Sequence, residues 1–302
     1  MTATRTSLPA MKRDYFYHVD ARGTLTLDGI IQDDPWFLDL FYRRLAQTAN
    51  PMFSDYPYVS RCGDEMNYLS PADTPIVYMR RDGDRLLYAA GTLSVPFEPA
   101  SLTYSSQGVL YHKAPVGTLG RIVPSLAMEL SRDIHGWGPW YAYRNTDGSM
   151  VVLEPMERQP HLVLLRPRKD NLCVGCGEAN SASMKLSFLH DQEAETVHTW
   201  IVPGPTMQGA LGVVHGGLVS LLLDEVMGKS LSVRGVRAPT ASLTVQFRKP
   251  MLTGVEYHCL SRLIQVSGRK YLLSGAIQQM DGVTVAESEG LFIAPTSERV
   301  SL

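Results

Sequence analysis

Val213-Val-His-Gly-Gly-Leu218 is followed by an almost wholly apolar run that contains Asp224, and this stretch is the most informative part of the chain. The paired glycines Gly216 and Gly217 leave backbone N–H groups uncovered at the start of a helix, where the macrodipole favours negative charge. A carboxylate in an otherwise apolar helix is costly unless it has a task or a partner. Together these features indicate a site that polarises a carbonyl group and then supplies an acid, a base or a nucleophile.

The helical phase of this run predicts a buried helix. Apolar residues between Gly217 and Val233 cover nearly every side of the helix, which is typical of a core element. Asp224 shares its stripe with Ser220 and Gly228, four residues to either side. These small neighbours leave room for a ligand beside the carboxylate.

The two parts of the predicted site are far apart within one chain. Asp224 follows Gly216 by eight residues, or roughly 12 Å along a helix. One thioester or ester carbonyl cannot contact both within a monomer. If both act, they come from different subunits, and the spacing then predicts a two-fold dimer with two shared sites.

The patterns around the helix predict antiparallel strands and therefore an α+β fold. Alternating or β-rich segments precede and follow the helix, and Pro250 ends the first strand after it. One long helix with consecutive antiparallel strands predicts a sheet that curls around the helix. The predicted strands are 185–190, 195–202, 243–247, 257–266, 270–279 and 283–293.

Residues from about 173 to 295 resemble hotdog-fold acyl-CoA thioesterases of the phenylacetate-pathway and THEM4-like group. The resemblance covers the whole C-terminal domain, and it implies that fold and thioester hydrolysis. The matching stretches are Cys173-Val-Gly-Cys-Gly, Gln208-Gly209, Val214-His-Gly-Gly-Leu, Leu223-Asp-Glu-Val-Met-Gly and Thr240-Ala-Ser-Leu-Thr-Val-Gln-Phe-Arg-Lys-Pro250.

The resemblance also implies roles for individual residues. Gly216 donates its N–H to the thioester oxygen, and Asp224 acts from the partner subunit as nucleophile or as base for water. Thr240, ten residues before the strand-ending proline, helps to place that water. Related enzymes carry Asn or Gln six residues before the histidine as a second donor. That position is Gly209 here, so either Gln208 takes the role or Gly216 acts with less help.

The remaining site residues have two interpretations each. His215 either takes part in the chemistry or orders the loop, as a histidine at a helix start often bonds to backbone. The basic residues Arg248, Lys249, Arg269 and Lys270 stand at strand ends and either bind the phosphates of coenzyme A or form plain surface.

The segment Cys173-Val-Gly-Cys176 resembles half of a zinc site, but the second cysteine pair is missing. His190 or His198 would complete it only if folding placed one of them there. We therefore expect no metal and no redox dithiol, only a turn in a reducing compartment. Glu225 lies four residues before Lys229, which predicts a solvated or rim ion pair on the helix.

Length and charge are ordinary. With 302 residues, two domains are expected, and a net charge of −2 indicates neither a nucleic-acid nor an anionic-membrane partner. No apolar run approaches the length of a membrane span. Residues 1–13 lack the apolar core of a secretory signal. We expect a cytoplasmic protein, with a mitochondrial location as the alternative.

Prolines interrupt a charged stretch between Glu154 and Asn171. We therefore predict a separate N-terminal α+β domain over 1–155, a linker over 156–170 and a hotdog domain over 171–302. Within the linker, residues 161–165 are either a short strand or loose chain.

The N-terminal half is predicted to contain a hairpin over 14–28, a helix over 35–46 capped by Asp34, strands at 75–79, 86–93 and 109–112, and a short helix at 126–131. It resembles a functionally uncharacterised family with a mitochondrial member in animals. The matching stretches are Arg13-Asp-Tyr-Phe-Tyr-His-Val-Asp20, Val59-Ser-Arg-Cys-Gly63 with Glu65 and Asn67, Ser94-Val-Pro-Phe-Glu-Pro99 and Leu110-Tyr-His112. Cys62 beside His112 or His18 is a weaker alternative site; a scaffold, substrate-selecting or partner-binding role is favoured.

The sequence thus predicts hydrolysis of an acyl-CoA thioester by a homodimer or a dimer of dimers, with coenzyme A entering only as part of the substrate. Two alternatives are a non-catalytic acyl-CoA sensor and a hotdog hydratase. The hydratase usually pairs a carboxylate with a histidine in a segment pattern that is absent here. No residue identifies the acyl group.

Overall fold

The computed structural model describes residues 13–49 and 51–296. Contacts divide the chain into two compact units. The first holds the chain up to His135 together with Leu153–Glu157, and the second holds Gly136–Val152 and the chain from Arg158 onward. Residues 1–12, on which the prediction about a secretory signal mainly rests, lie outside the described residues. No helix within the described ranges is long and apolar enough to cross a membrane.

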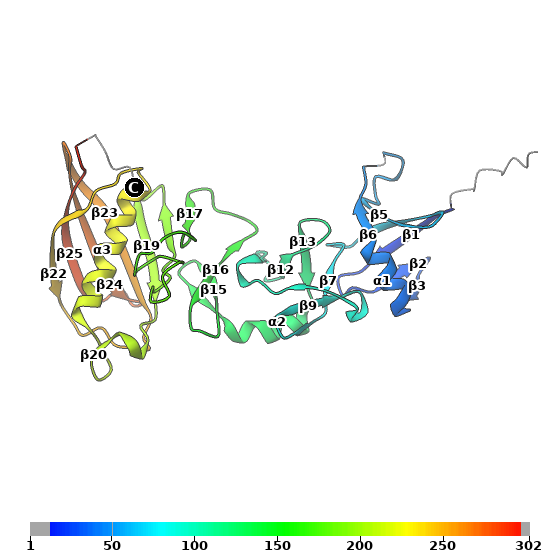
Figure 1. Cartoon of the computed structure of the whole chain (residues 1–302), viewed down its shortest axis with the longest axis horizontal. Coiled ribbons are helices and arrows are strands. Elements are labelled where there is room, and N and C mark those ends of the chain that lie inside the picture. The colour runs from blue at the N-terminus through cyan, green and yellow to red at the C-terminus, as the bar shows by residue number, and fades with distance from the viewer. Residues whose placement is uncertain (1–12, 50, 297–302) are drawn as a thin grey trace, which may run out of the picture. The chain divides into compact units, whose positions relative to one another are not determined.

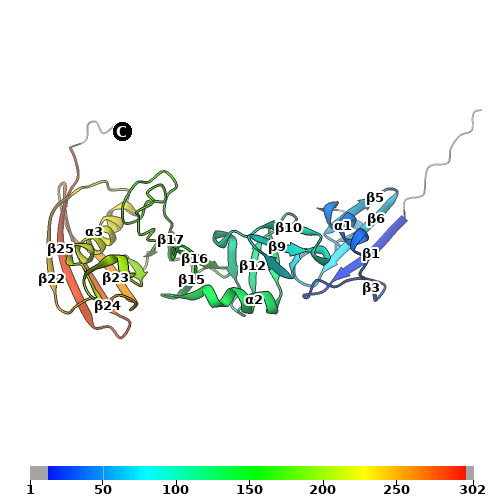
Figure 2. The ribbon, with the colours of Figure 1, turned by 60° about the horizontal axis from the view of Figure 1, so that its bottom comes forward.

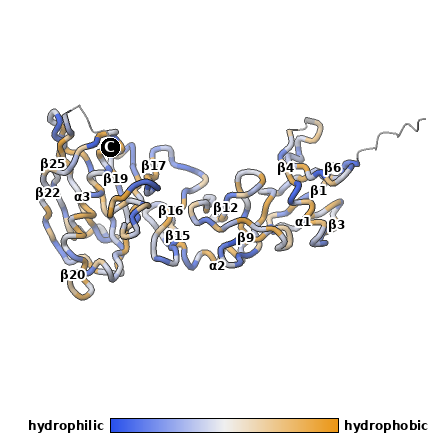
Figure 3. Tube along the Cα trace, in the orientation of Figure 1, coloured by the Kyte–Doolittle hydropathy of each residue, from blue (hydrophilic) through white to orange (hydrophobic). Residues whose placement is uncertain are grey.

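The centre of the second unit is the helix α3 (Gly216–Ser232), which is apolar on nearly all sides, as the sequence predicts. Its residues Leu222, Leu223, Val226 and Met227 are completely buried. A helix of this kind needs apolar partners all round, and the sheet provides them by curling about it (Figures 1 and 2). Hydrophobic and hydrophilic residues alternate along the surrounding strands (Figure 3).

Seven strands form this sheet in the order β17-β18-β19-β23-β24-β25-β22, and every neighbouring pair is antiparallel. The strand β22, which follows the helix, forms one edge. The predicted curled sheet around one helix is thus observed. Its strands are β17 (Leu162–Leu165), β18 (Phe188–Asp191), β19 (Thr196–Ile201), β22 (Thr240–Phe247), β23 (Tyr257–Ser267), β24 (Lys270–Gln279) and β25 (Thr284–Ile293).

Two differences from the expected boundaries concern this unit. The predicted linker contains β17, which pairs with β18 as a member of the sheet. Residues 136–152 also belong to this unit by contact, because Trp137 and Trp140 form a small core with Leu189 and Trp200. The strands involved are β14 (Ile134–Trp137), β15 (Trp140–Arg144) and the start of β16 (Met150–Pro155).

The predicted strand at 185–190 begins later, at Phe188. Lys185 has a positive φ of 53°, and its ammonium group donates to the carbonyls of Gly177, Glu178 and Asn180 at 3.1, 2.5 and 2.7 Å. This cation closes the preceding loop and keeps Lys185 out of the ladder. Before the helix, the short strands β20 (Gln208–Ala210) and β21 (Val213–Val214) form a hairpin that delivers the chain to His215.

The first unit contains a six-stranded sheet, β3-β2-β1-β6-β5-β4, in which β1 and β6 are parallel, a three-stranded sheet, β10-β9-β8, and the run β11-β12-β13-β7. Helix α1 (Pro35–Arg43) begins at Asp34, whose carboxylate accepts the N–H of Phe37 as predicted. The other elements are β1 (Arg13–Val19), β2 (Leu25–Leu27), β3 (Ile30–Gln32), β4 (Leu45–Gln47), β5 (Tyr58–Cys62), β6 (Glu65–Pro71), β7 (Val77–Tyr78), β8 (Arg80–Asp82), β9 (Arg85–Tyr88), β10 (Leu93–Pro96), β11 (Leu102–Tyr104), β12 (Leu110–Lys113), β13 (Leu119–Ile122) and α2 (Pro124–Leu130).

Two predictions in this unit are wrong in detail. The predicted helix over 35–46 ends at Arg43, because Leu45–Gln47 pairs with β5 instead. The predicted single strand 86–93 is a hairpin of β9 and β10. The chain reverses at Ala89–Gly91, where all three residues have positive φ values.

Candidate active site

The N-terminus of α3 presents one uncovered backbone donor. The Nδ1 atom of His215 accepts the N–H of Gly217 at 2.9 Å, and the His215 carbonyl accepts the N–H of Leu218. The N–H of Gly216 has no hydrogen-bond acceptor among the described residues. His215 therefore caps the helix, and its ring accepts the backbone N–H of Gly217. The backbone N–H of Gly216 is left to donate to a ligand at the positive end of the helix dipole.

Asp224 and Thr240 meet at the second part of the site. The Thr240 hydroxyl donates to Oδ1 of Asp224 at 2.6 Å. The other carboxylate oxygen, Oδ2, has no hydrogen bond to any described residue. The helix places Asp224 two turns beyond Gly216, and the loop after the helix returns the chain so that β22 begins beside it. A partly buried carboxylate with one oxygen held and one oxygen open is suited to act as base or nucleophile.

The two parts of the site lie at opposite ends of β22. Asp224 is bonded to Thr240, the first residue of the strand, whereas a Cβ added to Gly216 would lie 3.6 Å from the ring of Phe247, the last residue. Seven residue steps along a strand span about 23 Å. The structure therefore does not bring Gly216 and Asp224 together within one chain.

The strand β22 is an exposed edge. It pairs with β25 on one side only, and most of its residues are exposed to solvent. Phe247 is 57% exposed. An edge strand with unpaired backbone groups and an exposed aromatic side chain is a template for pairing with another chain.

Gln208, expected as a possible second donor, is engaged within its own hairpin. Its Oε1 accepts the N–H of Gly212 at 2.7 Å, and its Nε2 donates to the Pro205 carbonyl at 2.9 Å. A side chain at Gly209 would not fit either, because its Cβ would lie 2.9 Å from the Cα of His215. Of the two interpretations, the geometry favours Gly216 acting without a side-chain amide.

The four basic residues fall into two pairs at opposite ends of the sheet. The backbone N–H groups of Arg248 and Lys249 bond to Val285, near the end of β22, whereas Lys270 pairs with Ile293, near its start. Arg248 is also held by the Glu287 carboxylate. One phosphate group cannot contact both pairs within one chain.

The loop with both cysteines packs against α3 at Glu225. The Cys173 thiol donates to Oε2 of Glu225 at 3.3 Å, while Lys229 lies 3.7 Å from Oε1. The ion pair predicted on the helix is present, but it is not solvated, since the side chains of Glu225 and Lys229 are only 17% and 23% exposed. Burial, and then the Glu225 carboxylate, raise the pKa of Cys176 to about 12.

His190 and His198 do not join this loop. The His198 ring bonds to Thr196 and to His258, at 2.7 and 2.9 Å, and His190 pairs with Val197 across β18 and β19.

The alternative site in the N-terminal unit is not assembled. The Cys62 thiol neighbours the Ser60 hydroxyl at 3.6 Å, whereas the His112 ring bonds to the backbone of Glu98 and Lys113. His18 bonds to the Tyr56 hydroxyl at 3.2 Å. No nucleophile–base pair forms among these groups.

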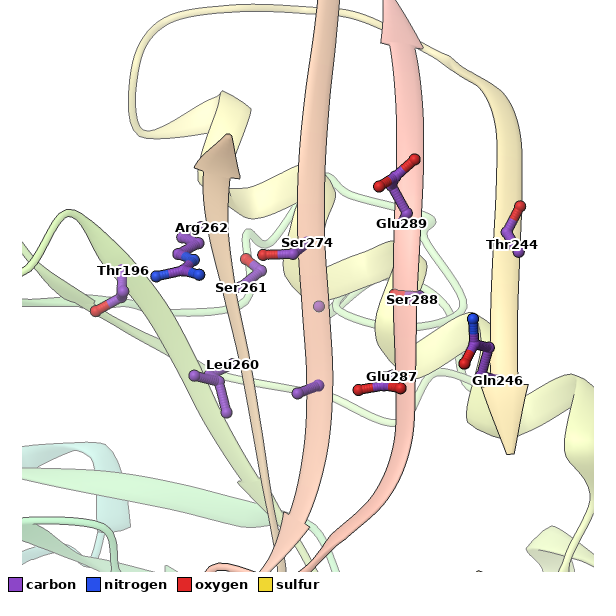
Figure 4. Close-up of a pocket in the computed structure, with 12 residues that line it drawn as sticks. Thr196, Thr244, Gln246, Leu260, Ser261, Arg262, Ser274, Glu287, Ser288 and Glu289 are labelled. Atoms are coloured by element: carbon purple, nitrogen blue, oxygen red, sulfur yellow. The ribbon is translucent and has the colours of Figure 1, made fainter. Parts of the chain in front are cut away.

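A hollow of about 420 Å³ lies on the other face of the main sheet (Figure 4). Glu287 and Glu289 line it and alternate with Ser288, whose hydroxyl contacts Met227 of α3 at 3.8 Å, so the two glutamates project away from the helix. Neither Gly216 nor Asp224 lines this hollow. It is therefore separate from the candidate site.

Sequence reasoning did not predict the contacts that three residues make in these regions. Phe247 lies beside Gly216, and Glu225 lies among the cysteines. Asn171, which precedes the cysteine loop, bonds to both cysteines through its side chain. The alternation of β22 marked Phe247 as a strand residue, and the C-x-x-C spacing marked the loop, but neither pattern indicates which helix residue lies opposite.

Comparison with known proteins gives one match to a family model and further matches to curated proteins. Residues 6–138 match a family model described as a domain of unknown function (DUF4505). The acyl-coenzyme A thioesterase THEM4 of Bos taurus is 33% identical over 115 residues, which are 38% of this chain and 47% of that protein. The acyl-coenzyme A thioesterase THEM5 of Mus musculus is 31% identical over 35% of this chain and 43% of that protein. The chain thus spans less than half the length of these curated relatives.

Two solved structures are also similar. One is a thioesterase superfamily protein, with 28% identity, a TM-score of 0.39, and coverage of 40% of this chain and 60% of that one. The other is the E. coli PaaI protein from the phenylacetic acid degradation operon, with 17% identity, a TM-score of 0.33, and coverage of 34% and 74%. The sequence matches confirm the resemblance to acyl-CoA thioesterases and, in the N-terminal half, to an uncharacterised family.

Proposed function

We propose that this protein hydrolyses an acyl-CoA thioester at a site shared between two copies of the chain. The observation that carries the proposal is the 2.6 Å hydrogen bond from Thr240 to Asp224, which leaves one carboxylate oxygen open. The names of the curated relatives, both acyl-coenzyme A thioesterases, supply the substrate class. The open N–H of Gly216 at the start of α3 supplies the carbonyl-binding group.

The position of both groups on one edge strand supports the shared site. If β22 pairs antiparallel with β22 of a second copy about a two-fold axis, the Thr240 end of each strand lies beside the Phe247 end of the other. Asp224 of one subunit then approaches Gly216 of the partner subunit. Two identical sites result, and a further pairing of dimers is compatible with this interface.

In the proposed reaction, the thioester oxygen accepts the Gly216 N–H, and the helix dipole stabilises the negative charge that develops on that oxygen. Asp224 removes a proton from water as the water oxygen attacks the carbonyl carbon. The Thr240 hydroxyl, whose hydrogen points to Asp224, uses its lone pairs to orient this water. The C–S bond then breaks, and the coenzyme A thiolate takes the proton.

A second route uses the same residues. Oδ2 of Asp224 attacks the carbonyl carbon directly, the C–S bond breaks, and the coenzyme A thiolate leaves as an acyl–aspartyl anhydride forms. Water then hydrolyses the anhydride to the free acid and the Asp224 carboxylate, and a proton from this water goes to the coenzyme A thiolate. Neither route uses a metal or a redox cofactor, and coenzyme A enters only as part of the substrate. The cytoplasmic or mitochondrial location stays a prediction.

The antiparallel dimer also affects the basic residues. It would place Arg248 and Lys249 of one subunit at the same end of the joined sheet as Arg269 and Lys270 of the other. We propose that coenzyme A phosphates bind among these residues. Lys249 is the best candidate of the first pair, because Arg248 is already paired with Glu287.

The test is release of coenzyme A from a panel of aryl and aliphatic acyl-CoA esters, measured by chromatography. Wild type is compared with Asp224→Asn and with Asp170→Asn, which changes a carboxylate that is 85% exposed. We expect kcat/KM for the best ester to fall at least about 1,000-fold in Asp224→Asn alone. Normal turnover in Asp224→Asn would refute the mechanism, and ester binding without turnover by all three proteins would favour the sensor.

A further inference from the structure

The cysteine loop is built tightly against α3. In the segment Asn171–Gly177, the N–H of Gly175 donates to the Cys173 sulfur at 3.3 Å, and the N–H of Gly177 donates to the Cys173 carbonyl at 2.8 Å. A Cβ at Gly175 would lie 2.8 Å from the Glu225 carboxyl carbon, and one at Gly177 would lie 2.3 Å from the Asn171 carbonyl oxygen. Only glycine at both positions lets the two sulfurs approach the helix in this way.

Three possible metal ligands converge at this contact. The sulfurs of Cys173 and Cys176 and a carboxylate oxygen of Glu225 all lie within 4.8 Å of one another, and they form the one such group among the described residues. Two thiolates with one carboxylate suit zinc, which takes Cys and Glu ligands in tetrahedral sites. Helix α3 therefore provides one of the two further ligands that the C-x-x-C pair needs.

Two N–H groups are directed at the sulfurs. The Asn171 side-chain amide donates to the Cys176 sulfur at 3.4 Å, and the Gly175 N–H donates to the Cys173 sulfur. Such N–H···S bonds orient metal-bound sulfur and stabilise its negative charge.

The charges balance as well. Glu225 uses Oε2 for the Cys173 thiol and Oε1 for Lys229. A divalent metal would replace the two thiol protons, so that two thiolates, the carboxylate, the metal and the Lys229 ammonium group together are neutral. The metal would take the position of the proton between Cys173 and Oε2, while Lys229 keeps the other oxygen.

We propose that Cys173, Cys176 and Glu225 form a structural site for a zinc-class divalent metal, with the fourth position filled by solvent. The metal clamps the loop to the turn of α3 that follows Asp224, and it takes no part in the thioester reaction. This inference does not depend on the proposed hydrolysis.

The main alternative for two neighbouring cysteines is a redox pair. A reactive dithiol requires a thiolate, which is favoured by nearby cations and by exposure. Here the Cys176 thiol is buried, and the Glu225 carboxylate lies beside both sulfurs, so a free thiolate is disfavoured. A metal overcomes this by displacing the proton outright, whereas an attacking thiol cannot. The surroundings thus favour a ligand over a nucleophile.

The test is titration of the full-length protein, reduced and freed of metal, with Co²⁺. We expect one cobalt ion per chain and a thiolate-to-cobalt charge-transfer band. The band should disappear in Cys173→Ser and Cys176→Ser and persist in Cys62→Ser, a matched change of a cysteine in the other unit. Glu225→Gln should weaken binding at least about tenfold. An unchanged band in Cys173→Ser, or no binding by wild type, would overturn the site.

A second measurement uses only the wild-type chain, so it does not depend on how the variants fold. Alkylation of each cysteine is followed by mass spectrometry with and without Zn²⁺. We expect Zn²⁺ to slow the modification of Cys173 and a chelator to restore it, with no effect on Cys62. Equal modification rates with and without zinc would contradict the proposal, as would a Cys173–Cys176 disulfide that forms in the presence of zinc.

Discussion

Thr240 and Asp224 are joined by a hydrogen bond in which the hydroxyl is the donor. The bond fixes the carboxylate rotamer and leaves the lone pairs of the hydroxyl oxygen facing solvent, where a water molecule can donate to them. In the proposed mechanism, Thr240 therefore positions both the carboxylate and the water, although it changes no bond itself.

The prediction that follows compares Thr240→Val with Thr240→Ser. Valine keeps the shape but loses the donor, so we expect kcat to fall about 10- to 100-fold with little change in KM. Serine retains the hydroxyl and should stay within a fewfold of wild type. Steady-state kinetics with the best ester distinguishes the two variants. If valine and serine behave alike, the hydroxyl has no role in placing the water.

Gly209 allows a second prediction about a single residue. The resemblance to hotdog thioesterases implies an amide side chain at this position, yet a Cβ at Gly209 would meet the Cα and Cβ of His215 at 2.9 and 3.1 Å. We expect Gly209→Asn to lower the free energy of unfolding by about 1–3 kcal/mol and to bring no gain in turnover. Gly204→Ala is the control, because nothing lies within 4 Å of its Cβ. Chemical unfolding of both variants is the measurement, and a more active Gly209→Asn enzyme would contradict the expectation.

For individual residues, the sequence spacing predicts which residues are candidates more readily than it predicts the contacts that they make. The Gly-Gly pair and the lone helix carboxylate identify Gly216 and Asp224 because few other local arrangements require them. The engagement of Gln208 within its own hairpin and of Glu225 with the cysteine loop depends on the path of the loops before the helix. The periodicity of the sequence does not predict the path of these loops.

Among the elements, β19 and β23 carry a histidine pair on their face away from α3. His198 and His258 are bonded at 2.9 Å, and His258 stacks on Trp200 with ring centroids 4.7 Å apart. Burial, and then the neighbouring His198, lower the pKa of His258 from 6.5 to about 4. Burial also lowers the pKa of His198.

These pKa shifts determine the sign of the pH dependence. Below pH 6.5 the unfolded chain takes up protons on both histidines, whereas the folded sheet does not protonate His258 until about pH 4. We therefore expect the free energy of unfolding of the second unit to fall between pH 6.5 and 4, by on the order of 3 kcal/mol for His258. Urea unfolding followed by tryptophan fluorescence should show this decrease.

The matched variants for that experiment are His258→Gln, which keeps a hydrogen-bonding group beside His198, and His161→Gln at a partly exposed histidine. The decrease should become smaller in the first and persist in the second. An unaltered pH profile in His258→Gln would assign the effect to other groups.

The boundaries of helices and strands could be predicted where the tertiary packing agrees with the local sequence pattern. The predicted strand 270–279 coincides with β24, and the predicted helix from Gly217 to Val233 is within one residue of α3 at each end. The hairpin at Ala89–Gly91 was not predictable, because two of its three left-handed residues are alanines, which rarely mark a turn. Contacts formed elsewhere override the strand pattern there.

For the whole molecule, contacts divide the chain into two compact units, and the assignment of residues 136–152 to the second unit could not be predicted from the sequence. It rests on contacts of Trp137 and Trp140 with Trp200 and Leu189, which are distant in sequence. Among the described residues of the unit that matches the DUF4505 model, His18, Cys62 and His112 are each bonded to other groups and form no nucleophile–base pair.

The proposed shared site can be tested with two variants that damage different parts of it. Gly216→Pro removes the carbonyl-binding N–H while keeping the helix, because proline is well tolerated at the first helical position. The preceding residue, His215, has φ −61° and ψ 132°, an extended conformation that proline accepts. Gly216→Pro and Asp224→Asn should each form inactive homodimers.

When the two variants are mixed and their subunits exchange, half of the dimers contain one chain of each kind. In such a dimer one site combines Gly216 of the Asp224→Asn chain with Asp224 of the Gly216→Pro chain, and the other site lacks both groups. We expect the mixture to recover about a quarter of wild-type turnover, because one site in four is then intact. Mass spectrometry of the intact dimers measures the exchange. Full exchange without recovery would show that each chain builds its site alone, since a site within one chain is damaged in every subunit of the mixture.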